Sequence, residues 1–210
     1  MGHPIFARFY ARTSQAMERG VARHRDQLLA GLSGTVIEVG AGNGMNFAHY
    51  PQEVTSVLAV EPEPHLRRLA EHNARQAPVE IKVVDATADH LPTPDTSVDA
   101  VVFSLVLCTI PSPATALSEA ARVLRPDGQI RFFEHVRADG RLAKAVQQLL
   151  QVTVFPTLSG GCHPARDTKT AIENAGFIID TLQHLTFSDT QIPFPISPQI
   201  LGAATTEKQP

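Results

Sequence analysis

The sequence Val-Ile-Glu-Val-Gly-Ala-Gly-Asn-Gly, residues 36–44, decides the fold of this chain. Its apolar first half predicts a buried strand, and glycines at alternate positions, Gly40, Gly42 and Gly44, predict a tight loop after that strand. Glycine is needed where the backbone takes a positive φ or where a ligand touches the main chain. A helix expected over residues 45–50 would leave its first N–H groups free. The stretch therefore predicts a binding site for a nucleotide-like cofactor.

The residues around the loop narrow the class of cofactor. A phosphate-binding P-loop places Lys and Ser or Thr at the helix start, but Met45-Asn46-Phe47 follows the last glycine here. A dinucleotide site has the spacing G-x-G-x-x-G, whereas the third glycine of this loop comes one residue early. Glu38, two residues before the loop, is unfavourable beside a pyrophosphate and suits a ligand with a charged amine.

A second acid, Glu61, ends the next predicted strand, 21 residues after Gly40. A carboxylate at the carboxyl end of a strand accepts hydrogen bonds from both ribose hydroxyls, and its charge disfavours a 2′-phosphate. The alternative is that Glu61 caps the following helix.

The rest of the chain alternates predicted strands with predicted helices. Strands are expected over residues 35–39, 56–61, 80–84, 98–104, 129–135, 177–186 and 199–205. Helices are expected over residues 63–76, 113–124, 140–152 and 167–176. This order predicts an α/β fold with a seven-stranded, mostly parallel, Rossmann-like sheet covered by helices on both faces, and a ligand beyond the carboxyl ends of the strands.

Within this single domain, residues 1–33 are expected to be helical, residues 34–136 to form the cofactor-binding core, and residues 137–210 to form the acceptor side with the last strands. The N-terminal segment, in one or two helices, either packs at the domain edge or forms a lid over the active site. Its short apolar face leaves peripheral membrane contact open. In the helix over 140–152, the residues expected to be buried are Leu142, Val146, Leu149 and Leu150.

Composition excludes several classes of function. The chain has 210 residues, 43% hydrophobic content and a net charge of −3, with no basic tract, so a nucleic-acid partner is not expected. No apolar run approaches the roughly 18 residues of a membrane-spanning helix. Two cysteines are too few for a disulfide framework, which favours a cytoplasmic location. The nine histidines show no helical spacing with a Cys or acid, so no metal site is expected.

Three motifs together carry a family resemblance. E-V-G-A-G-N-G resembles the first motif of class I S-adenosylmethionine-dependent methyltransferases, V-E-P the second, and D-A-T-A-D-H-L-P the adenine-binding loop. With S-L-V-L-C-T-I and R-V-L-R-P-D-G-Q-I, the resemblance covers about residues 34–136. It implies the class I methyltransferase fold, S-adenosylmethionine as the cofactor and S-adenosylhomocysteine as the product.

The resemblance also implies which residues contact the cofactor. They are Glu38, Gly40, Gly42, Gly44, Asn46, Glu61, Pro62, Thr87, Ala88, Ser104 and Leu105. Thr87 stands where the family often has an acid that binds the exocyclic amine of adenine, so Asp85 or Asp89 is an alternative partner for that amine.

A closer resemblance rests on F-S-L-V-L-C-T-I, F-F-E-H-V, G-G-C-H and A-R-D-T. These segments are similar to animal membrane-associated thiol S-methyltransferases and to small bacterial enzymes grouped with phospholipid or quinone methyltransferases. The animal enzymes begin with a hydrophobic anchor that is not present in this sequence. The resemblance implies a small-molecule acceptor, with a thiol as the first expectation, and an O-, N- or C-acceptor or a non-catalytic cofactor-binding module as alternatives.

Candidate residues on the acceptor side follow from position. His135, at the carboxyl end of the fifth predicted strand, is the candidate base that raises the thiolate fraction, or else it caps the strand end. Cys162 and His163 belong to the acceptor pocket or are ordinary loop residues. Arg166 recognises an acidic substrate group or pairs with Asp167 in solvent. Cys108 is expected to be a small buried hydrophobe.

Overall fold

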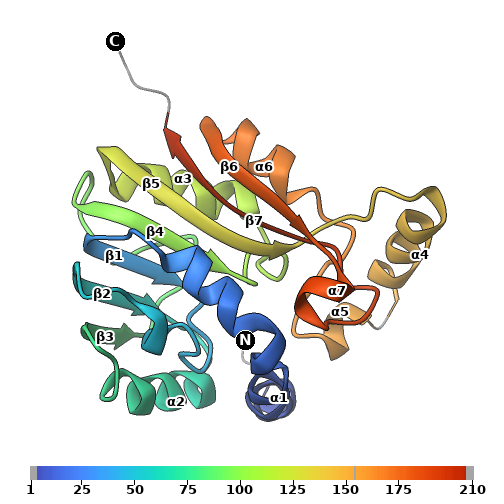
Figure 1. Cartoon of the computed structure of the whole chain (residues 1–210), viewed down its shortest axis with the longest axis horizontal. Coiled ribbons are helices and arrows are strands. Elements are labelled where there is room, and N and C mark those ends of the chain that lie inside the picture. Colours follow the sequence, from blue (N-terminus) through green and yellow to red (C-terminus); the bar gives the residue numbers. More distant parts are fainter. Residues whose placement is uncertain (1–3, 154, 207–210) are drawn as a thin grey trace.

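A seven-stranded sheet forms the centre of the molecule in the computed structural model, which describes residues 4–153 and 155–206. The strands are β1 (Gly34–Val39), β2 (Val54–Val60), β3 (Glu80–Val84), β4 (Val98–Ser104), β5 (Leu124–His135), β6 (Phe177–Leu185) and β7 (Gln199–Thr206). They lie in the order β3-β2-β1-β4-β5-β7-β6 (Figure 1). β7 runs antiparallel to β5 and β6, and the other pairs are parallel. The predicted Rossmann-like, mostly parallel sheet is confirmed.

Helices cover both faces of this sheet. They are α1 (Pro4–Leu29), the 3₁₀ turn η1 (Phe47–His49), α2 (Pro64–Ala74), α3 (Pro113–Val123), α4 (Arg141–Gln151), α5 (Phe155–Leu158), α6 (Thr168–Asn174) and α7 (Phe187–Thr190). Side chains of α1 and α2 share one apolar core with one face of the strands. Side chains of α3 and α6 share a second core with the other face. Each strand therefore has apolar residues on both sides, which explains the nearly continuous apolar runs in the sequence.

The strand order reverses between β1 and β4, as expected for the strand that carries the glycine loop. β1 pairs with β2 on one side and with β4 on the other. Loops that leave the carboxyl ends of β1 and β4 diverge at such a point and open a space for a ligand. The sheet topology thus places residues 40–46 and 104–110 at the edge of one site.

The structure defines the extent of two predicted helices. The N-terminal segment, expected as one or two helices, forms one continuous helix, Pro4–Leu29. The predicted helix over 45–50 is only the 3₁₀ turn Phe47–His49. Tyr50 has an extended ψ of 130°, because a residue before proline, here Pro51, disfavours the helical conformation.

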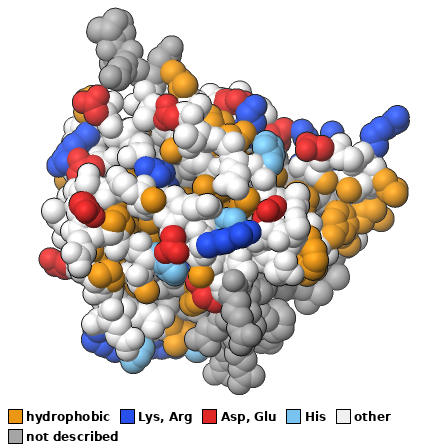
Figure 2. Space-filling view, in the orientation of Figure 1, with side chains coloured by type: hydrophobic (Ala, Val, Ile, Leu, Met, Phe, Trp, Pro, Cys, Tyr) orange, Lys and Arg blue, Asp and Glu red, His pale blue; other side chains and the backbone are white. Residues whose placement is uncertain are grey.

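The prediction that α4 buries its apolar residues is wrong. Leu142 is 81% exposed and Leu149 is 65% exposed, because α4 projects beyond the sheet (Figure 1) and its buried residue is Gln147. The Gln147 amide is held by the backbone: Nε2 donates to the Pro195 carbonyl at 2.8 Å, and Oε1 accepts from the Ala138 N–H at 2.7 Å. Figure 2 shows the hydrophobic side chains gathered on this projecting part.

Among the described residues, no helix combines the length and the apolar character needed to cross a bilayer.

Candidate functional site

The glycine loop has the backbone conformation that its sequence predicts. Gly40, Gly42 and Gly44 have φ values of +67°, +59° and +79°. The N–H of Gly40 donates to the Val60 carbonyl of β2 at 2.8 Å, which turns the chain over the end of the sheet. A Cβ added at Gly40 would lie 2.4 Å from Cγ2 of Val106, so the loop and the segment after β4 approach too closely for any side chain there.

Glu61 lies directly beside this loop. Its Oε2 accepts from the Gly42 N–H at 2.8 Å, and its Oε1 accepts from the Glu63 N–H at 2.9 Å. Burial raises the pKa of Glu61. An ionised carboxylate has about four acceptor positions, so two are left for the hydroxyls of a ribose. The alternative role as the helix cap belongs instead to Glu63, whose Oε2 accepts from the Leu66 N–H at 2.7 Å.

Glu38 supports the glycine loop through hydrogen bonds to two residues that follow it. Its Oε1 accepts from Nδ2 of Asn46 at 2.9 Å, and its Oε2 accepts from the Tyr50 hydroxyl at 2.7 Å. The side chain is 2% exposed, and burial raises its pKa to about 7. Both oxygens already have partners within the protein, so the geometry favours an action of Glu38 through the loop rather than by direct contact with a ligand.

The N-terminal helix α1 also contacts the loop. Nη1 of Arg25 donates to Oδ1 of Asn46 at 2.7 Å, and Nδ2 of Asn43 donates to the Ser14 hydroxyl at 3.1 Å. Arg25 is 6% exposed and Asn46 is 2% exposed. The helix therefore lies against the site, as the lid interpretation expects, and its function as a lid stays a prediction.

Ser104, the last residue of β4, and Leu105 lie near the glycine loop and were predicted to flank the cofactor. Oγ of Ser104 is buried without a hydrogen-bond partner among the described residues. Leu105 has a φ of +58°, a conformation that costs of order 1–3 kcal/mol for such a residue, and residues strained in this way cluster at functional sites. The orphaned hydroxyl and the strained backbone fit a site that is completed by a ligand, and they occur at the two residues predicted to flank the cofactor.

The predicted adenine contacts are less well defined by side chains. Pro62 follows Glu61 at the rim of the site. Thr87 is exposed and Ala88 is half-buried. Asp85 is engaged by Nη2 of Arg67 at 2.9 Å, while Asp89 is exposed. The structure therefore leaves Thr87, Ala88 and Asp89 accessible for the adenine, and the individual contacts stay predictions.

Glu134 organises the acceptor side and was not predicted to have a role. Its fully buried carboxylate accepts three backbone N–H groups: Val106 and Leu107 at 2.9 Å and Cys108 at 3.1 Å. Burial raises the pKa of Glu134. This carboxylate fixes the conformation of residues 106–108, which lie between the glycine loop and the acceptor side. An acid inside the apolar run F-F-E-H was the signal in the sequence.

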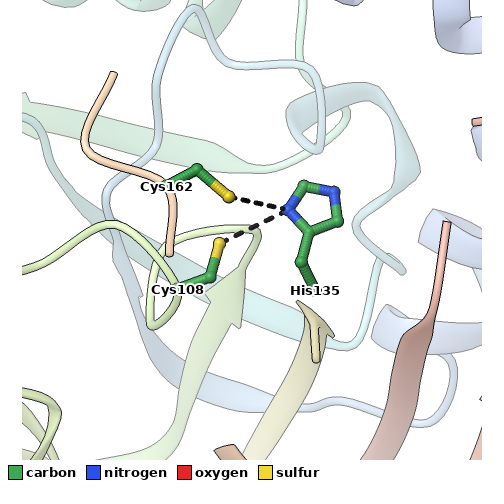
Figure 3. A group of neighbouring side chains, drawn as sticks. All are labelled: Cys108, His135 and Cys162. Carbon is green, nitrogen blue, oxygen red and sulfur yellow. Dashed lines mark hydrogen bonds between the residues drawn. The ribbon is translucent and has the colours of Figure 1, made fainter. Parts of the chain in front are cut away.

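Two predicted acceptor-side residues, His135 and Cys162, converge with Cys108 at the end of the sheet. Figure 3 shows Cys108, Cys162 and His135 with both sulfurs directed at Nδ1 of the imidazole. Sγ of Cys108 lies 3.4 Å and Sγ of Cys162 lies 3.6 Å from that nitrogen. All three side chains are buried, and Nε2 of His135 has no partner among the described residues. Cys108 is thus buried as expected, but its sulfur also makes a polar contact with Nδ1 of His135.

The loop that carries Cys162 is fixed by backbone contacts. The His163 N–H donates to the Cys108 carbonyl at 2.8 Å, and Nη1 of Arg166 donates to the carbonyls of Leu107 and Ile110 at 2.6 and 2.8 Å. The predicted pairing of Arg166 with Asp167 is wrong, because the segment turns the guanidinium inward. Arg137 pairs with Asp167 instead, at 2.7 Å. Burial lowers the pKa of His163.

Comparison with known proteins agrees with this geometry. Residues 37–132 match the family model described as a methyltransferase domain. A SAM-dependent methyltransferase from Thermotoga maritima superposes with a TM-score of 0.69 at 20% identity, over 97% of this chain and 98% of that one. The fold and the glycine-loop site thus define a class I methyltransferase that uses S-adenosylmethionine.

Two curated human proteins are more similar in sequence. The thiol S-methyltransferase TMT1B is 36% identical over 188 residues, which covers 84% of this chain and 73% of that protein. The thiol S-methyltransferase TMT1A is 36% identical over 166 residues, which covers 76% of this chain and 67% of that protein. The chain belongs to the class I S-adenosylmethionine-dependent methyltransferases, close to the thiol S-methyltransferase group.

Proposed function

We propose that this methyltransferase transfers the methyl group of S-adenosylmethionine to the sulfur of a small-molecule thiol. The observation that carries the proposal is the extent of the similarity to the thiol S-methyltransferases, 84% of the chain. The methyltransferase domain model matches only residues 37–132. The similarity to the thiol S-methyltransferases spans more residues than residues 1–132 contain. It therefore also includes part of the acceptor side after residue 132.

The cofactor would lie over the glycine loop. Gly40, Gly42 and Gly44 let it approach the backbone, and the spare acceptor positions of Glu61 suit the two ribose hydroxyls. The Ser104 hydroxyl and the Leu105 backbone would flank its methionine and adenine parts. Asn46, held by Glu38, keeps the loop in place. These roles are part of the proposal, and the contacts within the protein described above support them.

The acceptor would lie beyond β4 and β5, next to His135. S-adenosylmethionine supplies an electrophilic methyl group, so the protein has to position a nucleophile in line with it and supply that nucleophile as an anion. A free thiol has a pKa near 8.5 and is only about a few per cent ionised at neutral pH. His135 is the proposed catalytic residue that promotes the thiolate, and Cys162, His163 and Arg166 form or support the pocket around it.

A panel of acceptors tests the proposal. The protein is incubated with methyl-labelled S-adenosylmethionine and an alkyl thiol, an aromatic thiol, an amine, a phenol, a quinol or phosphatidylethanolamine vesicles. We expect labelled thioether from at least one thiol. Labelled product from an amine, phenol, quinol or lipid, with none from any thiol, would replace the proposal with the corresponding N-, O- or C-methyltransferase. Cofactor binding by calorimetry without turnover on the whole panel would favour a non-catalytic module.

A further inference from the structure

The distances in the Cys108–His135–Cys162 cluster match those of a metal site. Tetrahedral zinc, with Zn–S of about 2.3 Å and Zn–N of about 2.0–2.1 Å, places sulfur and nitrogen ligands about 3.6 Å apart and two sulfurs about 3.8 Å apart. The two S···N distances are 3.4 and 3.6 Å. The three ligand atoms all lie within 4.8 Å of one another, so the two sulfurs need to approach by at most about 1 Å.

The chemistry of the cluster favours zinc among the divalent metals. Thiolate and imidazole ligands in tetrahedral arrangement suit Zn²⁺, whereas Mg²⁺ and Ca²⁺ require oxygen ligands. Cys108 is 0% exposed, Cys162 is 4% exposed and His135 is 8% exposed. Two thiolates neutralise the charge of one Zn²⁺, so the loaded site carries no net charge into this buried region.

Contacts within the protein hold the backbone on both sides of the cluster. Glu134 fixes the backbone at Cys108, and Arg166 ties the loop of Cys162 to the same segment. A Cβ added at Gly161 would lie 3.0 Å from the Thr109 carbonyl oxygen, so glycine lets the two loops approach. A metal site gains affinity when the supporting groups hold its ligands in place.

The number of protein ligands leaves one coordination position free. In the described part of the chain, no further His, Cys, Asp or Glu joins the three. Structural zinc sites have four protein ligands, whereas catalytic sites have three and keep the fourth position for water or substrate. The cluster also lies at the carboxyl ends of β4 and β5, on the acceptor side of the segment that faces the glycine loop.

We propose that Cys108, His135 and Cys162 bind one Zn²⁺ and that the fourth position of this zinc takes the sulfur of the acceptor. The acceptor half of this inference rests on the proposed thiol methylation, whereas the metal half does not. In this arrangement His135 acts as a metal ligand, through Nδ1. A metal-bound thiol is deprotonated outright, which supplies the nucleophile that the reaction needs at neutral pH.

The acceptor R–SH gives its proton to water as its sulfur enters the fourth position. A lone pair of that sulfur forms the bond to the methyl carbon, while the carbon–sulfonium bond breaks and leaves its electron pair on S-adenosylhomocysteine. The product R–S–CH₃ is a neutral thioether, a weaker ligand than a thiolate, and water displaces it.

Metal content tests the site without any turnover. The full chain, prepared without a histidine tag and without chelators, is analysed by inductively coupled plasma mass spectrometry. We expect about one zinc per chain, and less than about a tenth of that in Cys108→Ser and in Cys162→Ser. The control is His184→Ala on the exposed face of β6, which should keep its zinc. Binding of S-adenosylhomocysteine by the Cys variants, measured by calorimetry, shows whether they are folded.

Cobalt substitution tests the fourth position. Co²⁺ in this site should show a thiolate-to-metal charge-transfer band from two sulfurs, and an alkyl thiol should raise it by about half as a third sulfur binds. No metal and no band after reconstitution would overturn the site. A band that no thiol changes would overturn the acceptor role. A band that rises with thiol, in a protein that methylates no thiol, would refute the proposed function and leave the metal site standing.

Discussion

Replacing Glu38 by Gln should stabilise the protein at neutral pH and leave it nearly unchanged in mild acid. Glu38 is 2% exposed, and its carboxyl contacts Asn46 and Tyr50. Gln can keep both contacts, since its oxygen can accept from the Asn46 amide and its Nε2 can donate to the Tyr50 hydroxyl. The variant therefore removes the ionisation of the side chain while retaining its shape and partners.

The magnitude follows from the pKa of Glu38. Burial raises it from 4.5 in the unfolded chain to about 7 in the folded protein. Between these values the folded state binds more protons than the unfolded state, so the free energy of unfolding falls as the pH rises. At 1.36 kcal/mol per pKa unit, the full loss is about 3 kcal/mol, complete above about pH 7. Glu38→Gln cannot ionise and should not suffer this loss.

Urea unfolding without cofactor, at about pH 5, 6, 7 and 8, measures the effect. The difference in unfolding free energy between Glu38→Gln and the wild type should grow with pH and level off above about pH 7. Glu80→Gln, at the exposed first residue of β3, is the matched control and should leave the pH dependence of stability unchanged. A difference that is constant over the whole range would refute the burial argument.

Two further substitutions test the cofactor site. Glu61→Gln should weaken cofactor binding by about ten- to a hundredfold, because a charged acceptor of the Gly42 N–H and the ribose is lost; an unchanged Kd in calorimetry would contradict the assignment. Gly40→Ala should cost about 1–3 kcal/mol more stability than Gly176→Ala. Both glycines have a positive φ, but only at Gly40 would the Cβ meet Val106, at 2.4 Å, so equal losses would show that the close approach does not matter.

Local sequence signals predicted most of the sheet. The predicted strands 80–84 and 98–104 have the observed bounds of β3 and β4, because apolar runs between turn residues are typical of buried strands. β5 instead begins at Leu124, the last residue of the helix predicted over 113–124, and so starts five residues before the predicted strand 129–135. The exposure of the apolar residues of α4 could not be predicted from its amphipathic pattern. Periodicity gives the apolar face of a helix but not whether that helix lies on the sheet.

The cofactor half and the acceptor half of the site also differ in how far the sequence could predict them. The glycine loop and Glu61 could be predicted because each lies at the end of a strand and its role follows from local geometry. The cluster of Cys108, His135 and Cys162 could not, because its members are 27 residues apart in sequence and meet only through the order of β4 and β5 and the loop held by Arg166. The expectation of no metal site considered spacing along the chain alone, which carries no information about such a group.

The position of β7 has a consequence for folding. β7 follows all other described strands in sequence, yet it lies between β5 and β6 and pairs with both over residues 199–206. Until it is in place, β5 presents an open edge of unpaired backbone groups, and β6 has no strand to join. Such an apolar edge is a template for pairing with another chain. A chain interrupted before residue 199 should therefore aggregate rather than form a smaller methyltransferase, even though residues 34–136 would be intact.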